Sequence, residues 1–394
     1  MKIVFSTLIV FMCNNQLLAQ NNNQLLSSKL AAIQAASNLP GFAVAVIKNN
    51  NVAYIEGFGH ANKNSKAAYT INTIQPVGSV SKTIIALALL KAVELNYFSL
   101  QSNINSLLPF AVVNPNFVNT NITINHLVTH TSSLLDDEET YTKTYTIGKV
   151  PSMPLGQFLQ AYYTPTGQWY KRTNFDTAAI GSTYHYSNIA AALAAYIIEV
   201  KAGISFNAFT QKYIFTPLQM MDTHWLYTTE KSDQYATLYE VNKQDNNGIA
   251  NLIQPDSSLQ NYSCITYPDG SLKTSIIDLS KYMLAMLKGY NGDSGILSKN
   301  GFTSLFAKQF TQANMPLLMD TKEVNRAVFW CYTKKGDIRH TGSDPGLMAF
   351  VSINPTKNSA RAFMLNTSLD GEDNAATVHA FMQIIKALDT YEND

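Results

Sequence analysis

The stretch Gly78-Ser79-Val80-Ser81-Lys82 and the apolar run Ile84–Val93 that follows it decide both the fold and the chemistry expected of this chain. The run is long and apolar enough to predict a buried helix. We expect Ser79 at the first turn of that helix, with Lys82 three residues later. Side chains at this spacing lie on one face, about one turn apart. A serine hydroxyl in this position can pass its proton to an amine held away from water, which is the first half of a serine nucleophile.

Length and composition limit the classes of protein to consider. The chain has 394 residues, of which 46% are hydrophobic. Single cores rarely exceed about 250–300 residues, so we expect two lobes. Charged residues make up only 14%, the formal net charge is +1, and there is no basic patch or acidic tail. Charge therefore gives no support for a nucleic-acid partner. We expect a small molecule or a peptide as the substrate.

The N-terminus has the pattern of an export signal. Lys2 precedes the apolar run Ile3–Met12, and a polar stretch follows that ends in Leu17-Leu18-Ala19-Gln20. The run is shorter than the roughly 20 residues that span a bilayer as a helix. We therefore expect a signal peptide over 1–20 and a periplasmic or extracellular protein without a transmembrane segment in its mature part. Cys13 is a less suitable lipid-attachment site, because Val-Phe-Met precedes it instead of small residues.

Strand-like runs stand at both ends of the chain and helical patterns stand between them. Phe42–Ile47 and Val52–Phe58, joined by Lys48-Asn49-Asn50-Asn51, predict a hairpin. The expected helices cover Gln24–Asn38, Ile84–Val93, Phe158–Tyr162, Ile189–Val200, Phe206–Tyr213, Asp278–Lys288 and His379–Leu388. The later strands are expected over Ala327–Thr333, Asp337–Thr341, Met348–Ile353 and Ala360–Thr367.

This order predicts a mixed α/β (α+β) fold. One antiparallel sheet is built from both chain ends and flanked by helices, and a mostly helical lobe is inserted into it. We place the α/β lobe at 21–75 plus 265–394 and the helical lobe at 76–264. Two weakly patterned stretches, Asp136–Gly156 and Tyr239–Asn261, are expected to be surface loops.

Two further motifs follow the serine in a fixed order. Tyr186-Ser187-Asn188 directly precedes the apolar helix Ile189–Val200, and His340-Thr341-Gly342 ends a predicted strand. Taken singly, each has an ordinary explanation. Ser79 and Asn188 could be helix caps, and the histidine could belong to a turn. All three motifs, in this order and on these elements, indicate a catalytic serine.

Metal ligands and cofactors have little support in the sequence. His126 and His130 are four residues apart, but no glutamate stands between them to complete a zinc-binding His-Glu-x-x-His pattern. We expect them to pack in the core, with no metal and no cofactor. Cys264 and Cys331 remain in the mature chain and could pair in an oxidising compartment or stay as buried thiols.

With these motifs, the chain resembles the serine β-lactamase and penicillin-binding-protein superfamily. It is most similar to the branch of class C β-lactamases, D,D-carboxypeptidases and esterases. Pro40–Gly59 resembles the opening hairpin of the family. Ile122–Leu134 resembles its His-Thr-Ser-Gly-Leu segment, and Lys273–Leu279 resembles the segment before the penultimate helix. The resemblance covers nearly all of the mature chain and implies a β-lactamase/transpeptidase-like fold.

The resemblance also implies roles for individual residues. Ser79 would be the acylated nucleophile, and Lys82 would accept or relay its proton. Tyr186 would be the partner base and protonate the leaving group. Asn188 would hold Lys82 and bind the amide or acyl side chain of the substrate. The backbone N–H groups of Ser79 and Ser343 would form the oxyanion hole.

The third motif departs from most β-lactamases, because His340 stands where they carry a lysine. Thr341 and Gly342 complete the motif and would line the substrate. In the family this histidine is common among carboxypeptidases and esterases, and its charged form could attract a substrate carboxylate. Ser133 also replaces a frequent glycine, which could reshape the cleft.

The sequence thus predicts an exported, monomeric serine hydrolase that forms an acyl-enzyme with an ester or an amide. Its activity would be of the D,D-carboxypeptidase or esterase type, or that of a β-lactamase. A catalytically silent β-lactam- or peptidoglycan-binding or sensor protein with the same pocket is the alternative.

Overall fold

The structure is a computed structural model that describes residues 20–240, 249–369 and 375–393. The expected export segment, apart from its last residue, and Cys13 lie outside the described residues. The first described element is a helix over 20–35, which begins and ends a few residues earlier than the helix expected over Gln24–Asn38.

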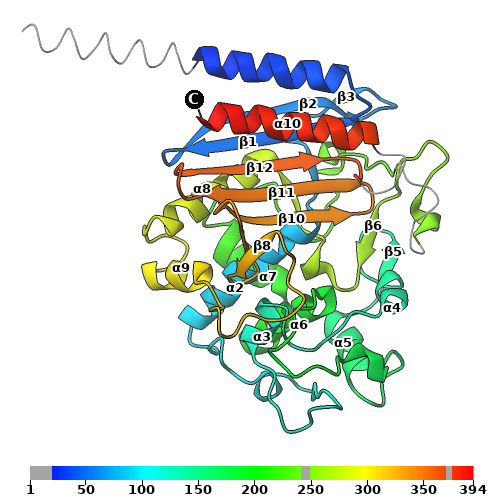
Figure 1. Ribbon diagram of the computed structural model, residues 1–394. Coiled ribbons are helices and arrows are strands. Elements are labelled where there is room, and N and C mark those ends of the chain that lie inside the picture. Colours follow the sequence, from blue (N-terminus) through cyan, green and yellow to red (C-terminus); the bar gives the residue numbers. More distant parts are fainter. Residues whose placement is uncertain (1–19, 241–248, 370–374, 394) are drawn as a thin grey trace, which may run out of the picture.

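An eight-stranded antiparallel sheet forms the upper part of the molecule (Figure 1). Its strand order is β3-β2-β1-β12-β11-β10-β9-β8. The strands are β1 (Gly41–Lys48), β2 (Asn51–Asn62), β3 (Ala67–Ala68), β8 (Glu323–Arg326), β9 (Cys331–Thr333), β10 (Ile338–Asp344), β11 (Leu347–Asn354) and β12 (Ser359–Leu365). In the middle of the sheet β1 pairs with β12, from Phe42 opposite Leu365 to Lys48 opposite Ser359. The expectation of one antiparallel sheet built from both chain ends is confirmed.

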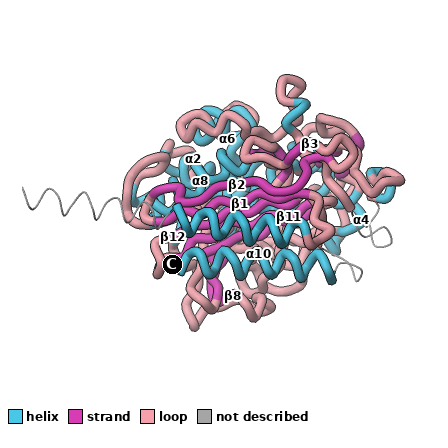
Figure 2. The backbone as a smooth tube through the Cα atoms, turned by 90° about the horizontal axis from the view of Figure 1, so that it is seen from above, coloured by secondary structure: helices cyan, strands magenta, loops and turns pink. Residues whose placement is uncertain are grey.

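Strand β1 is apolar on both faces because both faces of the sheet are covered. Its even-numbered residues from Phe42 to Val46 belong to a cluster with side chains of the N-terminal helix and of α10 (Ala375–Asn393). Its odd-numbered residues from Ala43 to Ile47 belong to the larger cluster on the other face. Figure 2 looks down on the layer of the two terminal helices. Alternating side chains of an extended strand point to opposite faces, so a strand between two layers is apolar throughout.

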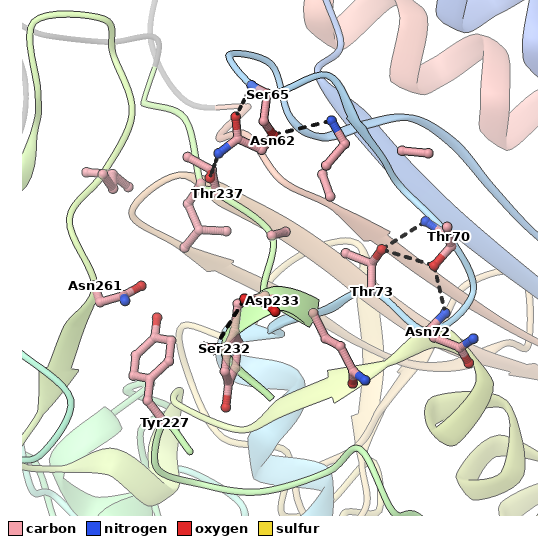
Figure 3. Close-up of a pocket in the computed structure, with 18 of the residues that line it drawn as sticks. Asn62, Ser65, Thr70, Asn72, Thr73, Tyr227, Ser232, Asp233, Thr237 and Asn261 are labelled. Atoms are coloured by element: carbon pink, nitrogen blue, oxygen red, sulfur yellow. Dashed lines mark hydrogen bonds between the residues drawn. The ribbon is translucent and has the colours of Figure 1, made fainter. Parts of the chain in front are cut away.

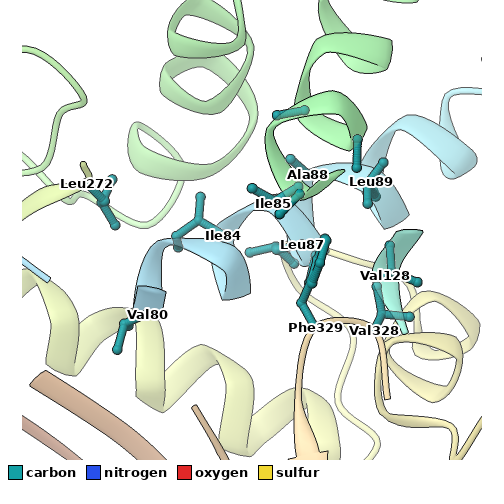
Figure 4. Packing of buried hydrophobic residues seen from close by; sticks show 14 of the residues in the cluster. Val80, Ile84, Ile85, Leu87, Ala88, Leu89, Val128, Leu272, Val328 and Phe329 are labelled. Atoms are coloured by element: carbon teal, nitrogen blue, oxygen red, sulfur yellow. The ribbon is translucent and has the colours of Figure 1, made fainter. Parts of the chain in front are cut away.

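Below the sheet, helix α2 (Ser81–Glu94) runs through the centre of the helical core. Eleven of its fourteen residues are buried, which is typical of a helix surrounded by protein on all sides. Figure 4 shows its apolar side chains meeting Val128, Val328 and Phe329 from other segments. The other helices are α3 (Ile124–Val128), α4 (Glu138–Thr142), α5 (Leu155–Tyr163), α6 (Asn188–Ala202), α7 (Phe206–Thr210), α8 (Ile276–Tyr290) and α9 (Lys299–Phe306).

A second, two-stranded sheet fixes the start of α2. Strand β4 (Ile74–Pro76) pairs with β7 (Lys273–Ser275). Directly after β4, the N–H of Val77 donates to the Leu272 carbonyl oxygen at 3.0 Å. The N–H of Leu272 in turn donates to Ser81 Oγ at 3.1 Å. The segment that carries the serine motif is therefore held on both sides by hydrogen bonds to one distant strand.

Two expectations about local structure are wrong. The supposed loop Asp136–Gly156 contains α4 and the strand β5 (Tyr145–Ile147), which pairs with β6 (Tyr262–Cys264). A three-residue strand depends on a partner far along the chain, which no local pattern reveals. The supposed strand Ala327–Thr333 is broken, because the N–H of Ala327 bonds the Trp330 carbonyl in a tight turn. Its apolar residues enter the helical core instead of extending the sheet.

Both described cysteines, Cys264 and Cys331, are buried and free. Among the described residues, no single helix is long and apolar enough to cross a membrane. Within the parts of the chain that the structure describes, one bent pair, α6 with Phe206–Phe215, meets that length and composition, and its two parts are bent by 80°.

Leu87 provides a test of the packing around α2. Its side chain is fully buried in the main cluster. Replacement by alanine should lower the free energy of unfolding by about 2–5 kcal/mol, because it removes apolar contacts and leaves a cavity. The matched change at Leu25, which is 68% exposed, should alter it by less than about 0.5 kcal/mol. Urea unfolding of both variants measures the difference, and equal effects would contradict the packing described.

Candidate active site

The serine of the motif lies in a tight 3-10 turn, Gly78–Val80, that leads directly into α2. The sequence placed Ser79 in the first turn of the helix itself, so the helix begins slightly later than expected. Gly78 has a φ of +53°, a conformation that favours glycine. Gly342 on β10 approaches so closely that a Cβ there would lie 2.0 Å from the Val77 carbonyl oxygen. The turn therefore packs backbone to backbone against the strand that carries the third motif.

Lys82 is fully buried, and its ammonium group makes three hydrogen bonds. Nζ donates to Ser79 Oγ at 3.1 Å, to Asn188 Oδ1 at 2.7 Å and to the Asp269 carbonyl oxygen at 2.8 Å. The three acceptors come from three separate segments of the chain. They fix the nitrogen at hydrogen-bond distance from the hydroxyl, which is the geometry that proton transfer between the two groups requires.

Asn188 is held in turn by Asp136, a residue that the sequence analysis did not select. Asp136 Oδ2 accepts from the N–H of Asn188 at 2.6 Å. Its Oδ1 accepts from Ser187 Oγ at 2.6 Å and from the N–H of Ile189 at 3.2 Å. A carboxylate at the N-terminus of α6 also interacts favourably with the helix dipole. Burial raises the pKa of Asp136, and the bonds from Ser187 and Asn188 act in the opposite direction.

The aromatic ring of Tyr186 borders Lys82 and His130. Lys82 Nζ is 4.9 Å from the centroid of the Tyr186 ring, and the centroids of the Tyr186 and His130 rings are 4.4 Å apart. The side chain is 38% exposed, and its hydroxyl makes no hydrogen bond with any described residue. Burial holds the pKa of His130 well below its usual value, so this histidine is a neutral support, and its Nδ1 accepts from the N–H of Ser187 at 3.2 Å. Catalytic hydrogen bonds are often absent from a site without substrate.

His340 is buried and does not carry the charge that the sequence analysis considered. Burial and the nearby Lys82 ammonium lower the pKa of His340 to about 3. Its Nδ1 donates to the Thr341 carbonyl oxygen at 2.7 Å, and its Nε2 is buried without a partner in the described structure. The lowered pKa of His340 therefore argues against a role for its charged form near neutral pH. Neither the sequence of the motif nor its position at a strand end revealed this burial.

A cavity of about 370 Å³ opens beside these groups and contains two arginines that the sequence analysis missed. Arg326 is paired with Glu323 at 2.5 Å and contacts the Tyr184 hydroxyl. Arg339 is half-buried and forms no ion pair with any described residue. The residues that line the cavity are Ser79, Tyr184, Tyr186, Asp320, Glu323, Arg326, Cys331, Arg339, His340, Thr341 and Ser343.

The two backbone segments expected to form an oxyanion hole lie against each other. A Cβ at Gly78 would be 3.0 Å from the Ser343 nitrogen, and a Cβ at Gly342 would be 3.0 Å from the Ser79 nitrogen. Thr341 and Ser343 are exposed toward the cavity side of β10. The structure thus brings the turn that carries Ser79 against the part of β10 that carries Gly342 and Ser343, and their role as an oxyanion hole stays a prediction.

The molecule has a second, larger cavity away from the serine. It measures about 570 Å³ and lies beside β2 and β3 (Figure 3). Figure 3 shows Tyr227 and Asn261 on one side of this space, with Thr70 and Asn72 on the other. Its lining includes none of the three motifs. No group of histidine, cysteine and acidic residues in the described parts of the chain is arranged to hold a metal ion.

The fold and the site define a protein in which a serine and a lysine are paired at the head of a central helix, under a sheet made by both chain ends. A family model described as Beta-lactamase matches residues 26–381. The chain therefore belongs to the Beta-lactamase family, whose members are generally serine hydrolases. This confirms the resemblance inferred from the three motifs.

Two curated proteins are similar to the chain at low sequence identity. The chain is 22% identical to Protein flp of Staphylococcus aureus (strain MW2) over 335 residues, which cover 84% of this chain and 60% of that protein. It is 24% identical to Penicillin-binding protein 4* of Bacillus subtilis (strain 168) over 263 residues, or 64% of this chain and 52% of the relative. The chain thus spans between about half and three-fifths of the length of these curated relatives.

Solved structures share the fold. A class C β-lactamase superposes with a TM-score of 0.67 at 19% identity, covering 93% of this chain and 97% of the other. The octameric penicillin-binding protein homologue from Pyrococcus abyssi gives 0.66 at 21% identity, covering 91% and 77%. These likenesses confirm the expected β-lactamase/transpeptidase fold. The monomeric state expected from the sequence stays a prediction.

Asp136 gives a test of how the site is held. In the unaltered protein both carboxylate oxygens of Asp136 accept hydrogen bonds from backbone N–H groups. In Asp136→Asn the amide NH₂ would face one of these donors and could not accept from it. The turn before α6 should therefore shift, and Asn188 should lose its place beside Lys82. An orphaned buried donor costs about 1–3 kcal/mol of stability. We expect at least a tenfold slower reaction of Ser79 with an acylating probe, measured at a temperature where the variant is folded.

The neighbouring change Asp137→Asn is a matched control. Asp137 caps α4 and pairs with Lys171 at the surface, so the labelling rate should stay within about twofold of the unaltered protein. Equal rates for both variants would show that Asp136 does not position the site.

Proposed function

We propose that this protein is a serine hydrolase that cleaves an ester or an amide through an acyl-enzyme on Ser79. The observation that supports this most directly is the position of Lys82 Nζ, which bonds both Ser79 Oγ and Asn188 Oδ1. A serine hydroxyl is a weak nucleophile until an adjacent base takes its proton. Here the base is Lys82 Nζ, which is buried and therefore bonds protein atoms instead of water.

In the first half-reaction Lys82 acts as a neutral amine: Ser79 Oγ attacks the carbonyl carbon of the substrate, and the hydroxyl proton passes to the lone pair of Lys82 Nζ. The backbone N–H groups of Ser79 and Ser343 would stabilise the oxyanion, where losing one donor typically costs about 10²–10³ in rate. The bond from the carbonyl carbon to the leaving oxygen or nitrogen then breaks. Tyr186, whose ring borders the Lys82 ammonium, would deliver the proton to the leaving group.

In the second half-reaction a water molecule attacks the acyl-enzyme. Its proton returns through Tyr186 and Lys82 to Ser79 Oγ, the ester bond to the serine breaks, and a carboxylic acid leaves. No other acid or base is required, so the same three residues serve both steps.

The cavity beside His340 would receive the leaving group. Since His340 is neutral, a carboxylate on the leaving group would be attracted by Arg339, the arginine without an ion pair in the described residues. This favours an activity of the D,D-carboxypeptidase or esterase type over that of a dedicated β-lactamase. We further propose that the protein works outside the cytoplasm, on the basis of its N-terminal sequence.

Covalent labelling tests the nucleophile. After incubation with a fluorophosphonate or penicillin, mass spectrometry of the digested protein should find the adduct on Ser79, and Ser79→Ala should remove it. The exposed Ser232, far from the motif in sequence and outside the cavity, provides the control Ser232→Ala, which should label normally. An unmodified Ser79 with every probe would overturn the proposed function. A stable adduct without turnover would instead favour the silent binding or sensor protein.

A pH profile tests the state of His340. Because its pKa is about 3, the imidazole stays neutral from pH 5 to 8, and no change of charge at His340 should affect the rate there. His340→Gln should therefore change the size of kcat/KM for a carboxylate-bearing ester without moving any inflection of the profile between pH 5 and 8. An inflection near pH 6.5 that disappears in this variant alone would show that the histidine titrates in the working range.

A further inference from the structure

One histidine holds Tyr186, the residue assigned to protonate the leaving group, at three points. The N–H of His185 donates to the backbone carbonyl oxygen of His130 at 2.8 Å. The N–H of Ser187 donates to His130 Nδ1 at 3.2 Å. Between these two bonds the rings of His130 and Tyr186 have their centroids 4.4 Å apart and their planes inclined by 33°. A single residue therefore fixes the backbone on both sides of the tyrosine and also contacts its ring.

The His130 ring is itself enclosed by other rings. The side chain is 1% exposed. The rings of Phe329 and Tyr184 meet the imidazole edge-on, with centroids 5.4 and 5.9 Å away. Arg326 lies over the Tyr184 ring, 4.6 Å from its centroid, and donates to its hydroxyl. These contacts restrict rotation of the imidazole, so the surface that it presents to Tyr186 is fixed.

The bond from Ser187 requires a neutral imidazole. Nδ1 accepts the backbone N–H through its lone pair, so the ring proton of His130 is on Nε2. Burial, together with the charges of Arg326 and Lys82, holds the pKa of His130 well below its usual value. The histidine therefore keeps the acceptor that fixes Ser187 near neutral pH.

Packing alone does not account for an imidazole at this position. His130 has a φ of +57°, a left-handed conformation that glycine adopts more readily. Its Nε2 is buried and has no hydrogen-bond partner in the described structure. Both features reduce stability. A glycine would avoid the first and an apolar side chain the second, so the imidazole provides something other than stability.

We propose that His130 is a positioning residue that holds the Tyr186 ring where its hydroxyl can protonate the leaving group. This inference rests on the proposed function and concerns one step of it. In that step the Tyr186 O–H bond breaks, and its proton binds the leaving oxygen or nitrogen as the bond to the carbonyl carbon breaks. The phenolate then regains a proton from Lys82, which had taken one from Ser79. His130 touches no reacting atom.

Two esters of one acid test the inference. The acid, chosen between acetic and octanoic acid, is the one whose p-nitrophenyl ester the full chain cleaves fastest. The comparison is with the ethyl ester of the same acid, since p-nitrophenolate leaves without a proton and ethoxide needs one. A residue that only stabilises the fold would affect the two esters equally, because both are cleaved by the same folded fraction.

His130→Asn removes the ring but keeps a side-chain oxygen that can accept from Ser187, and asparagine tolerates a positive φ. It should lower kcat/KM for the ethyl ester at least about tenfold, and that for the p-nitrophenyl ester less than about threefold, because only the ethyl ester needs a well-placed acid. His130→Gly adopts the left-handed conformation without strain and also lacks the ring. It should show the same selectivity, which keeps the test independent of a folding defect in one variant.

His126 provides a matched control four residues earlier. Its Nδ1 also accepts a backbone N–H, that of Thr123 at 3.1 Å, but its ring contacts no aromatic ring in the described parts of the chain. His126→Asn should leave the ratio of the two kcat/KM values within about twofold of that of the unaltered protein. Thermal unfolding of each variant confirms that the compared proteins are folded.

A double-mutant cycle tests whether His130 acts through Tyr186. Tyr186→Phe removes the acid and should slow the ethyl ester by about 10²–10⁴, more than it slows the p-nitrophenyl ester. In the Tyr186→Phe background, adding His130→Asn should slow the ethyl ester by no more than about a further twofold, because two residues that serve one step are not additive.

The outcomes separate the two proposals. If the His130 variants slow both esters equally or leave their ratio unchanged, or if the loss adds fully to that of Tyr186→Phe, the inference is wrong and the proposed function stands. Cleavage of the p-nitrophenyl ester without any cleavage of the ethyl ester would show that no acid is in position, which also contradicts the inference. If Tyr186→Phe causes no preferential loss on the ethyl ester, the acid role of Tyr186 and the inference fall together. Cleavage of neither ester removes the proposed hydrolase function and the inference with it.

Discussion

The site depends on the buried amine of Lys82 and the three oxygens that surround it. One oxygen belongs to Ser79, one to the side chain of Asn188 and one to the backbone at Asp269. An amine inside a protein is tolerated only when its hydrogens have acceptors. The three segments must therefore meet correctly for α2 to pack. The same contacts place Lys82 beside Ser79.

The surrounding structure serves to bring those segments together. Asp136 holds the N-terminus of α6, so that Asn188 reaches the lysine. Leu272, which directly precedes β7, holds the start of α2 through Ser81. On the other side Gly342 allows β10 to approach the serine turn to within backbone contact. The turn that carries Ser79 is thus held from the helical lobe and from the sheet at the same time.

The parts of this arrangement that could be predicted from the sequence are the local ones. Ser79 and Lys82 are three residues apart, so helical geometry alone places them together. The strands and the apolar helices have clear periodicity, and the motif order led to the fold class. Asp136 and the Asp269 carbonyl were missed because their partners are distant in the chain. Arg339 was missed because an isolated basic residue has no pattern. The neutral state of His340 follows from burial, which a sequence motif does not show.

The pairing of β1 with β12 has a consequence for folding during protein synthesis. The ribosome makes the hairpin of β1 and β2 early, whereas β12 (Ser359–Leu365), the strand that pairs with the other edge of β1, is made much later. Until then one edge of β1 offers unsatisfied backbone groups, the kind of edge that invites aggregation. The strand that packs against the serine, β10, also emerges late. A nascent chain therefore exposes this edge until Ser359–Leu365 has been made, and the turn that carries Ser79 gains its neighbour on the sheet only after Ile338–Asp344 has been made.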